Sequence, residues 1–259
     1  MIQVDTTSIP LLLKELRLPT MSKLWKDIGN EALNKGWTPM RYLKVLCEYE
    51  LEDRENRRFK RRMLEAKLLP GKTLETFDFS SVPSLNKSQI TGLGSGDFWI
   101  KEGKNILLFG PSGSGKSHLG SAIGDKLVEA GFRVCFTRTT ELLQKLQAAK
   151  RDLSLPAALD KLDKYDCLIL DDFGYVQKNE IETSLLFELI CERYERRSLL
   201  ITCNQPFKEW DGIFTDKRMA VAAIDRLVHH ATILEMNVES YRKKSAINKL
   251  KKEKKTVCH

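Results

Sequence analysis

The sequence lacks any apolar run long enough to span a lipid bilayer, and its start lacks the charged, apolar and small-residue segments of a signal peptide. These absences exclude a membrane-spanning protein and predict a cytoplasmic one. Paired C-x-x-C spacing is also missing among the six cysteines. Cys135, Cys167 and Cys203 lie in short apolar runs typical of strands. We therefore interpret the cysteines as small buried side chains in a reducing compartment, not as zinc ligands or disulfides.

Helix-turn-helix, zinc-finger and aromatic stacking motifs are absent as well, which predicts weak sequence preference in any contact with nucleic acid. The net charge of +8 is nevertheless unevenly distributed over the 259 residues. Residues 1–73 carry +5, residues 74–241 carry −4, and residues 242–259 carry +7. Basic ends around a mildly acidic core indicate a polyanion partner, such as DNA, contacted mainly outside the core.

The order of apolar patterns predicts an all-helical N-terminal domain, an α/β domain and a tail. Residues 1–70 show helical spacing, with a helix start at Thr38-Pro39 and an end at Pro70-Gly71. Residues 71–103 resemble a connector to the α/β domain, which extends to residue 241, and the basic tail covers 242–259. Apolar strands that alternate with helices are typical of a parallel sheet covered on both faces. The five expected strands are 106–109, 134–137, 167–170, 199–202 and 232–236.

A phosphate-binding loop follows the first expected strand directly and precedes a helix, which is the context that its motif requires. The sequence G-P-S-G-S-G-K-S from Gly110 to Ser117 lets backbone N–H groups and a helix N-terminus face the phosphates of ATP. We expect Lys116 to bridge the β- and γ-phosphates and Ser117 to coordinate Mg²⁺. The expected ATP-binding set is Gly110, Pro111, Ser112, Gly113, Ser114, Gly115, Lys116, Ser117 and His118.

Polar residues end two further apolar strands. Asp171 and Asp172 follow the run Cys167-Leu-Ile-Leu and should lie at the carboxyl edge of the sheet, where open α/β folds bind ligands. Asp171 is expected in the Mg²⁺ shell, and Asp172 is expected to polarise the water that attacks the γ-phosphate. Asn204 ends the strand at 199–202. It either orients the same water or simply forms a turn before Gln205-Pro206.

Basic residues near both ends of the chain form candidate DNA surfaces. The first has helical spacing of i, i+3, i+4, i+7 and i+8, so that one helix face presents Arg54, Arg57, Arg58, Arg61 and Arg62. Because Glu52, Asp53 and Glu55 are close, the alternative is a solvated face of intrahelical ion pairs, although the dominance of arginine favours phosphate contact. The tail from Lys243 to Lys255 either binds DNA nonspecifically or remains disordered.

The chain resembles the AAA+ ATPases, and within them the IstB family of transposition helpers, which are related to the bacterial helicase loaders. The resemblance covers essentially the whole chain. Its marks are Tyr42–Glu50, Arg54, Arg57-Arg58, Arg61-Arg62, Ala66-Lys67, Thr73–Phe79, Asn105–Phe109, Asp171–Tyr175, Arg193–Ser198, Asp225–His230 and Ser240–Arg242.

The resemblance implies an ATPase of an insertion sequence that oligomerises with ATP on duplex target DNA and hands this target to its transposase, which stimulates hydrolysis. It also implies an arginine that completes the active site of a neighbouring subunit. Arg226 is the candidate and Arg218 the fallback, unless Arg226 instead pairs with an acid on its own helix. Arg242 would sense nucleotide or support the subunit contact. Related rings line their pore from the region that corresponds here to Arg138, Thr139, Lys145, Lys150 and Arg151, so the resemblance makes these residues a second candidate set for contact with DNA.

One departure and two alternatives accompany this resemblance. Few residues follow Met236, so we expect no C-terminal helical lid domain. A replicative helicase loader that acts on single strands remains the alternative function. A small-molecule kinase is disfavoured, because no acceptor-pocket motif or arginine-rich lid is found in the sequence.

Overall fold

The computed structural model describes residues 7–174 and 177–238, which form two compact units that meet between Arg61 and Arg62. This boundary lies inside a long helix, before the domain boundary at residue 70 that the sequence predicts. Each unit is described by itself below.

The first unit is helical, as the sequence predicts. It contains α1 (Ile9–Glu15), α2 (Pro19–Asn34) and most of α3 (Pro39–Ala66). A small core forms where Met21 and Ile28 of α2 pack with Leu46 of α3. The proline at the first position of α2 and of α3 fits the helix start, because its missing N–H would have no intrahelical partner there.

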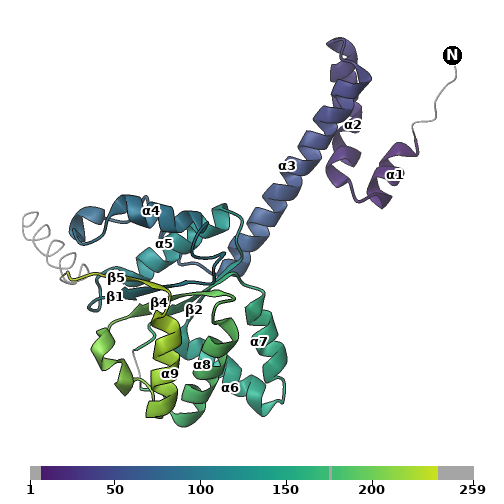
Figure 1. Ribbon diagram of the computed structural model, residues 1–259. Helices are drawn as coiled ribbons and strands as arrows, with labels where there is room; N and C mark the ends of the chain where they lie inside the picture. Colours follow the sequence, from purple (N-terminus) through teal and green to yellow (C-terminus); the bar gives the residue numbers. More distant parts are fainter. Residues whose placement is uncertain (1–6, 175–176, 239–259) are drawn as a thin grey trace, which may run out of the picture. The chain divides into compact units, whose positions relative to one another are not determined.

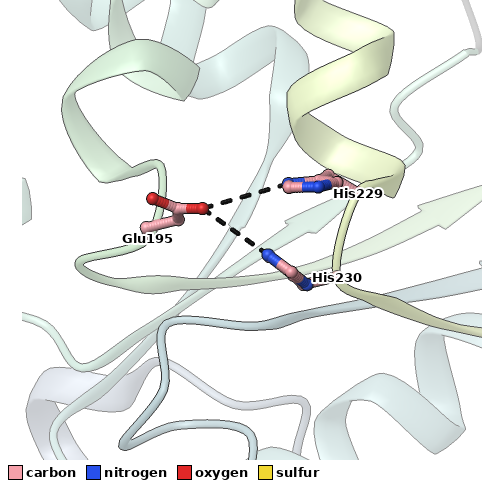
Figure 2. Close-up of side chains that lie close together, drawn as sticks. All are labelled: Glu195, His229 and His230. Carbon is pink, nitrogen blue, oxygen red and sulfur yellow. Dashed lines mark ion pairs between the residues drawn. The ribbon is translucent and has the colours of Figure 1, made fainter.

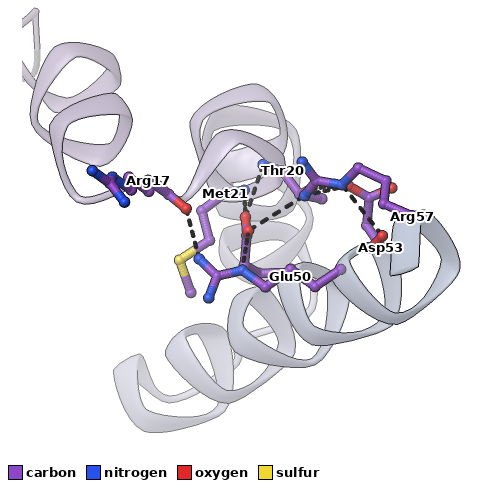
Figure 3. A network of polar contacts seen from close by, with 7 residues as sticks. Arg17, Thr20, Met21, Glu50, Asp53 and Arg57 are labelled. Atoms are coloured by element: carbon purple, nitrogen blue, oxygen red, sulfur yellow. Dashed lines mark hydrogen bonds and ion pairs between the residues drawn. The ribbon is translucent and has the colours of Figure 1, made fainter. Parts of the chain in front are cut away.

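A buried carboxylate joins the start of α2 to α3 (Figure 3). Oε2 of Glu50 accepts the backbone N–H groups of Thr20 and Met21 at 2.8 and 3.1 Å, and only 2% of Glu50 is exposed. Helix N-terminal N–H groups lack intrahelical acceptors and carry partial positive charge, so a carboxylate stabilises this end of α2.

The second unit is built on a parallel sheet of five strands in the order β2-β3-β4-β1-β5. Three central strands, β1 (Asn105–Phe109), β3 (Cys167–Asp171) and β4 (Ser198–Cys203), are buried along their whole length. The outer strands are β2 (Val134–Arg138) and β5 (Ala231–Glu235). The sequence predicts all five strands to within a residue or two, since buried parallel strands are read as continuous apolar runs.

Helices cover both faces of this sheet (Figure 1). α4 (Lys87–Ser95) and α5 (Lys116–Glu129) lie on one face. The other face carries α6 (Thr139–Arg151), α7 (Leu155–Asp163), α8 (Glu180–Arg193) and α9 (Lys217–Val228). Short 3₁₀ turns lie at Phe79–Ser81 and Phe207–Gly212. Because all strands run the same way, their carboxyl ends share one edge, where the loops after β1, β3 and β4 meet.

The structure adds two helices that the sequence analysis does not predict. α7 lies between the second and third strands, and α4 lies inside the stretch interpreted as a connector because of its glycines. The signal for α4 is Asn86, whose side chain accepts the backbone N–H groups of Ser88 and Gln89 and so caps the helix. The tail lies outside the described residues, and the expectation about a C-terminal lid therefore stays a prediction.

Candidate nucleotide-binding site

The glycine-rich loop lies between β1 and α5, as its motif predicts. Gly113 and Gly115 have φ of 80° and 100°, in the left-handed region that favours glycine. At Gly110 a Cβ atom would come within 2.6 Å of the carbonyl oxygen of Met236, so only glycine fits there. Lys116 is 6% exposed, and its ammonium group donates to the carbonyl oxygens of Gly110 and Pro111 at 2.7 and 2.9 Å.

The two aspartates end β3 beside the loop and are organised by Thr202 of β4. The Thr202 hydroxyl donates to Oδ1 of Asp171 at 2.6 Å and accepts the backbone N–H of Asp172 at 3.0 Å. Asp171 is 5% exposed, whereas Asp172 is exposed and has φ of 55°. A non-glycine residue in this conformation is strained, and such strain is found where a side chain must be aimed at a site.

The loop and the aspartates line a cleft of about 750 Å³. Its other wall is the segment before α4, which contributes Lys72, Thr76, Phe77 and Val82. The sequence analysis assigns no site role to this wall. Phe77 lies close to the loop, because a Cβ atom on Gly115 would be 3.2 Å from its ring. A flat aromatic side chain next to a phosphate cradle is suited to contact the base or ribose of a nucleotide.

His118, on the first turn of α5, joins the two walls. Its Nε2 lies 3.1 Å from both the Thr76 hydroxyl and the Thr73 carbonyl oxygen, and its ring packs edge-on against Phe77 at 5.2 Å. Burial lowers the pKa of His118 from its ordinary value of 6.5 and outweighs the opposite effect of the contact with Thr73. His118 therefore lines the cleft as an orienting residue between connector and helix.

The donor atoms in the cleft fit a nucleotide and a hard divalent cation. Ser117 supplies a hydroxyl and Asp171 a carboxylate, the oxygen ligands that Mg²⁺ prefers. The buried Oγ of Ser114 has no hydrogen-bond partner among the atoms of the described residues. A hydroxyl buried in this way is suited to donate to a phosphate oxygen.

The remaining predicted catalytic residues have different surroundings. Asn204 lines the cleft beside the two aspartates. Arg226 of α9 is not among the residues that line it. Its guanidinium donates to the Ala222 carbonyl oxygen at 2.8 Å and lies 5.6 Å from the centroid of the Phe187 ring. Arg218 is exposed at the start of α9, and Arg242 lies outside the described residues.

The arginine face of α3 contains both paired and more exposed members. Arg54 donates to Glu50 at 2.9 Å and to the Arg17 carbonyl oxygen at 2.6 Å, and Arg57 pairs with Asp53 at 2.9 Å (Figure 3). The contacts with Glu50 and Asp53 match the alternative of intrahelical ion pairs, whereas the contact with Arg17 joins α3 to the turn between α1 and α2. Arg58 has a looser contact of 3.7 Å with Glu55 and a side chain that is 59% exposed. Arg61 is also exposed, and Arg62 is half-buried.

The second predicted DNA set lies at the end of β2 and along α6. Arg138 lines the cleft, and Lys145, Lys150 and Arg151 are exposed on α6. Thr139 differs, because it is completely buried and its hydroxyl donates to the Asp171 carbonyl oxygen at 2.9 Å. The side chain of Thr139 thus supports the strand that carries the aspartates, and its expected contact with DNA is corrected on this ground.

Known proteins resemble the chain over most of its length. Residues 11–249 match the family of IstB-like ATP-binding proteins. An insertion sequence ATP-binding protein of Sinorhizobium fredii is 55% identical over 94% of this chain and 82% of its own length. The ATP-binding protein of insertion sequence IS21 from Pseudomonas aeruginosa is 36% identical over 91% of this chain and 89% of its own length.

Solved structures resemble the α/β unit in fold. The DnaC helicase loader matches with a TM-score of 0.56 and 21% identity, over 65% of this chain and 98% of that one. AMPPCP-bound DnaA from Aquifex aeolicus matches with the same TM-score and identity, over 72% of this chain and 56% of its own. Within the described ranges, no helix combines the length and apolar character needed to cross a membrane.

Proposed function

The chain belongs to the family of IstB-like ATP-binding proteins, and from this premise we propose that it is a DNA-dependent ATPase that selects targets for an insertion sequence. In this proposal ATP promotes oligomerisation on duplex DNA in the cytoplasm. The transposase then stimulates hydrolysis and receives the target. The names of the relatives, ATP-binding proteins of insertion sequences, support the nucleotide and the genetic context.

The observation that carries the proposal is the convergence of the loop, the two aspartates and Asn204 on one cleft. Backbone N–H groups of the loop and the ammonium of Lys116 supply positive charge for the phosphates. The carbonyl oxygens that Lys116 contacts lie in the same loop, so the ammonium can turn to a phosphate oxygen with little movement.

The same cleft supports hydrolysis. Ser117 and Asp171 would hold Mg²⁺, which neutralises charge on the phosphate oxygens when bound. Asp172 is exposed to the cleft and would accept a proton from the attacking water, while Asn204 would orient this water by a hydrogen bond. Thr202 keeps both aspartates in position from the neighbouring strand.

Arg226 would complete the site of an adjacent subunit. Its guanidinium contacts a backbone carbonyl oxygen and aromatic rings, and the structure records no ion pair with a carboxylate for it within residues 7–174 and 177–238. An arginine without a fixed carboxylate partner can reach a phosphate at moderate cost. Arg218 remains the fallback.

The proposed contacts with DNA are electrostatic. The more exposed arginines of α3, Arg58 and Arg61, and the exposed cations of α6 are suited to phosphate oxygens, which carry no sequence information. Affinity should therefore fall steeply with salt. The basic tail from Lys243 to Lys255 would add to this attraction, whereas Arg242 would sense nucleotide or support the subunit contact.

An assembly experiment tests the function. The full chain is mixed with duplex or single-stranded DNA of equal length, with and without ATP and Mg²⁺, and its mass on DNA is measured by analytical ultracentrifugation. We expect ATP-dependent assembly on duplex DNA and capture of the cognate transposase. Assembly on single strands alone, with capture of the replicative helicase instead, would contradict the proposal and support a helicase loader.

A further inference from the structure

Glu195, His229 and His230 bring one carboxylate and two imidazoles together at the edge of the sheet opposite the nucleotide cleft (Figure 2). Glu195 lies between α8 and β4, and the two histidines lie between α9 and β5. One possible ligand atom from each residue is within 4.8 Å of the other two. Oε1 of Glu195 is 3.9 Å from Nδ1 of His229 and 3.5 Å from Nε2 of His230.

The arginines next to Glu195 pair with other carboxylates, so its own carboxylate faces the two imidazoles. The next residues along the chain are cations, but Arg196 pairs with Asp163 at 3.0 Å and Arg197 with Asp166 at 2.7 Å. Among the described residues, the ion-pair partners of Glu195 are the two histidines. Imidazole nitrogens and carboxylate oxygens both donate lone pairs to metal ions. A bound cation would satisfy all three groups at once.

The backbone fixes the position of Glu195. Its φ is 57°, a strained value for a residue with a side chain. Gly103 approaches closely, because a Cβ atom there would come within 2.7 Å of the Glu195 carbonyl carbon. Just before Glu195, the buried guanidinium of Arg193 donates to the carbonyl oxygens of Leu162, Tyr165 and Ser198. The carboxylate is therefore presented by an anchored turn and not by a loose loop.

We propose that Glu195, His229 and His230 bind a divalent transition-metal ion of the Zn²⁺ class. Two imidazole nitrogens and one carboxylate oxygen are a common ligand set for such an ion, with water in the open position. Tetrahedral ligands at about 2.0–2.2 Å from zinc lie roughly 3.4 Å apart, close to the separations seen from the shared oxygen of Glu195.

The site connects to the arginine proposed to act on a neighbouring subunit. The hydroxyl of Tyr194 lies 2.7 Å from Nδ1 of His229, and the Tyr194 ring lies 5.9 Å from the guanidinium of Arg226. A metal ion bound at Nδ1 replaces the contact with the Tyr194 hydroxyl. It would tie the end of α9, which carries Arg226, to the end of α8.

Direct titration with ZnCl₂ tests the site without any ATPase readout. The full untagged chain carries Cys258→Ser and His259→Asn, so that these potential ligands near the chain end are removed from the background. Isothermal titration calorimetry is expected to show a saturable site that His230→Asn and Glu195→Gln each weaken tenfold or more. The same variants should lose the visible absorption band that Co²⁺ acquires when bound to wild type.

Two matched variants separate coordination from folding. Glu192→Gln removes a nearby carboxylate that pairs with Arg196 and should leave Zn²⁺ affinity within twofold. Tyr194→Phe removes the hydroxyl that competes for Nδ1 and should bind at least as tightly. Unchanged affinity in Glu195→Gln and His230→Asn, or equal loss in Glu192→Gln, would overturn the proposal. If His230→Asn lowers the thermal unfolding midpoint of the metal-free protein, the Zn²⁺ affinity of Glu195→Gln decides whether the site coordinates metal. Glutamine has nearly the same size as glutamate, so this variant is expected to keep the fold.

Discussion

The hydroxyl of Thr202 donates a 2.6 Å hydrogen bond to the carboxylate of Asp171 on the adjacent strand, and it accepts the backbone N–H of the next residue, Asp172. Thr202 is completely buried. One hydroxyl thus holds one oxygen of the expected metal ligand and the backbone of the expected general base. Thr202 is a positioning residue for both.

Replacing Thr202 with valine should slow ATP hydrolysis about ten- to a hundredfold. The change preserves shape but removes a hydrogen bond to a charged group, which contributes about 1.5–3 kcal/mol. Initial rates measured over a range of Mg²⁺ concentrations should also show a higher Mg²⁺ requirement. Thr202→Ser restores the hydroxyl and should recover most of the rate. A wild-type rate and Mg²⁺ dependence in Thr202→Val would exclude the positioning role.

Arg226→Ala should leave nucleotide affinity of the isolated chain unchanged and suppress hydrolysis by the oligomer. The reason is that Arg226 does not line the cleft of its own chain. Hydrolysis is measured while variant and wild-type chains are mixed at constant total concentration. We expect a fall steeper than simple dilution, because each variant subunit disables a neighbour. A hydrolysis rate that falls only in proportion to the wild-type fraction would show that Arg226 is not the trans-acting arginine. The same mixing experiment with Arg218→Ala then tests the fallback.

The two kinds of arginine on α3 should respond differently to alanine. Arg58→Ala with Arg61→Ala should weaken duplex binding and reduce the slope of log K against log salt by roughly two units, about 0.9 per phosphate contact. Arg54→Ala should instead lower the thermal unfolding midpoint, because it removes the nearer of the two guanidinium groups that pair with the buried carboxylate of Glu50, at 2.9 Å against 3.7 Å for Arg57. Lys35→Ala with Lys44→Ala, which removes two exposed cations, is the charge-matched control for the double variant. A salt slope equal to that of wild type in the double variant would rule out these contacts.

The stability of the chain should fall as pH drops below about 6.5, with a contribution from His118. Burial lowers the pKa of His118 in the folded protein, so the unfolded chain binds more protons between the two pKa values. The contribution is complete above the unfolded pKa and is lost progressively as pH falls from that value through the lower, folded pKa. Urea unfolding between pH 7.5 and 5.5, without nucleotide, should show a shallower pH dependence in His118→Gln. Equal slopes in the two proteins would contradict this cause.

The sequence reveals the parts of the site that are contiguous. The loop from Gly110 to Ser117 and the pair Asp171-Asp172 are short motifs whose spacing and flanking strands are visible directly. Thr202 is different, since its position within the fourth strand indicates only a buried residue. Its role depends on β3 and β4 being neighbours, which follows from the strand order and not from any local pattern.

The other features that the sequence does not reveal also depend on contacts between segments that are far apart in the chain. Phe77 and Thr76 precede the first strand by many residues, and they reach the cleft only because their segment packs against α5. The spacing of the arginines on α3 predicts their common face correctly as a helical pattern. It cannot show that Arg54 is bound to Glu50, because Glu50 is also fixed by the start of α2.

The central claim, that ATP in this cleft controls the hold on DNA, is tested most directly by comparing Asp172→Asn with Lys116→Ala. Dissociation from a labelled duplex is followed by fluorescence anisotropy after addition of ATP and Mg²⁺. The account predicts that Asp172→Asn binds ATP and remains on DNA far longer than wild type, while Lys116→Ala does not respond to ATP. Equal dissociation of all three proteins, or near-normal hydrolysis by Asp172→Asn, would contradict it.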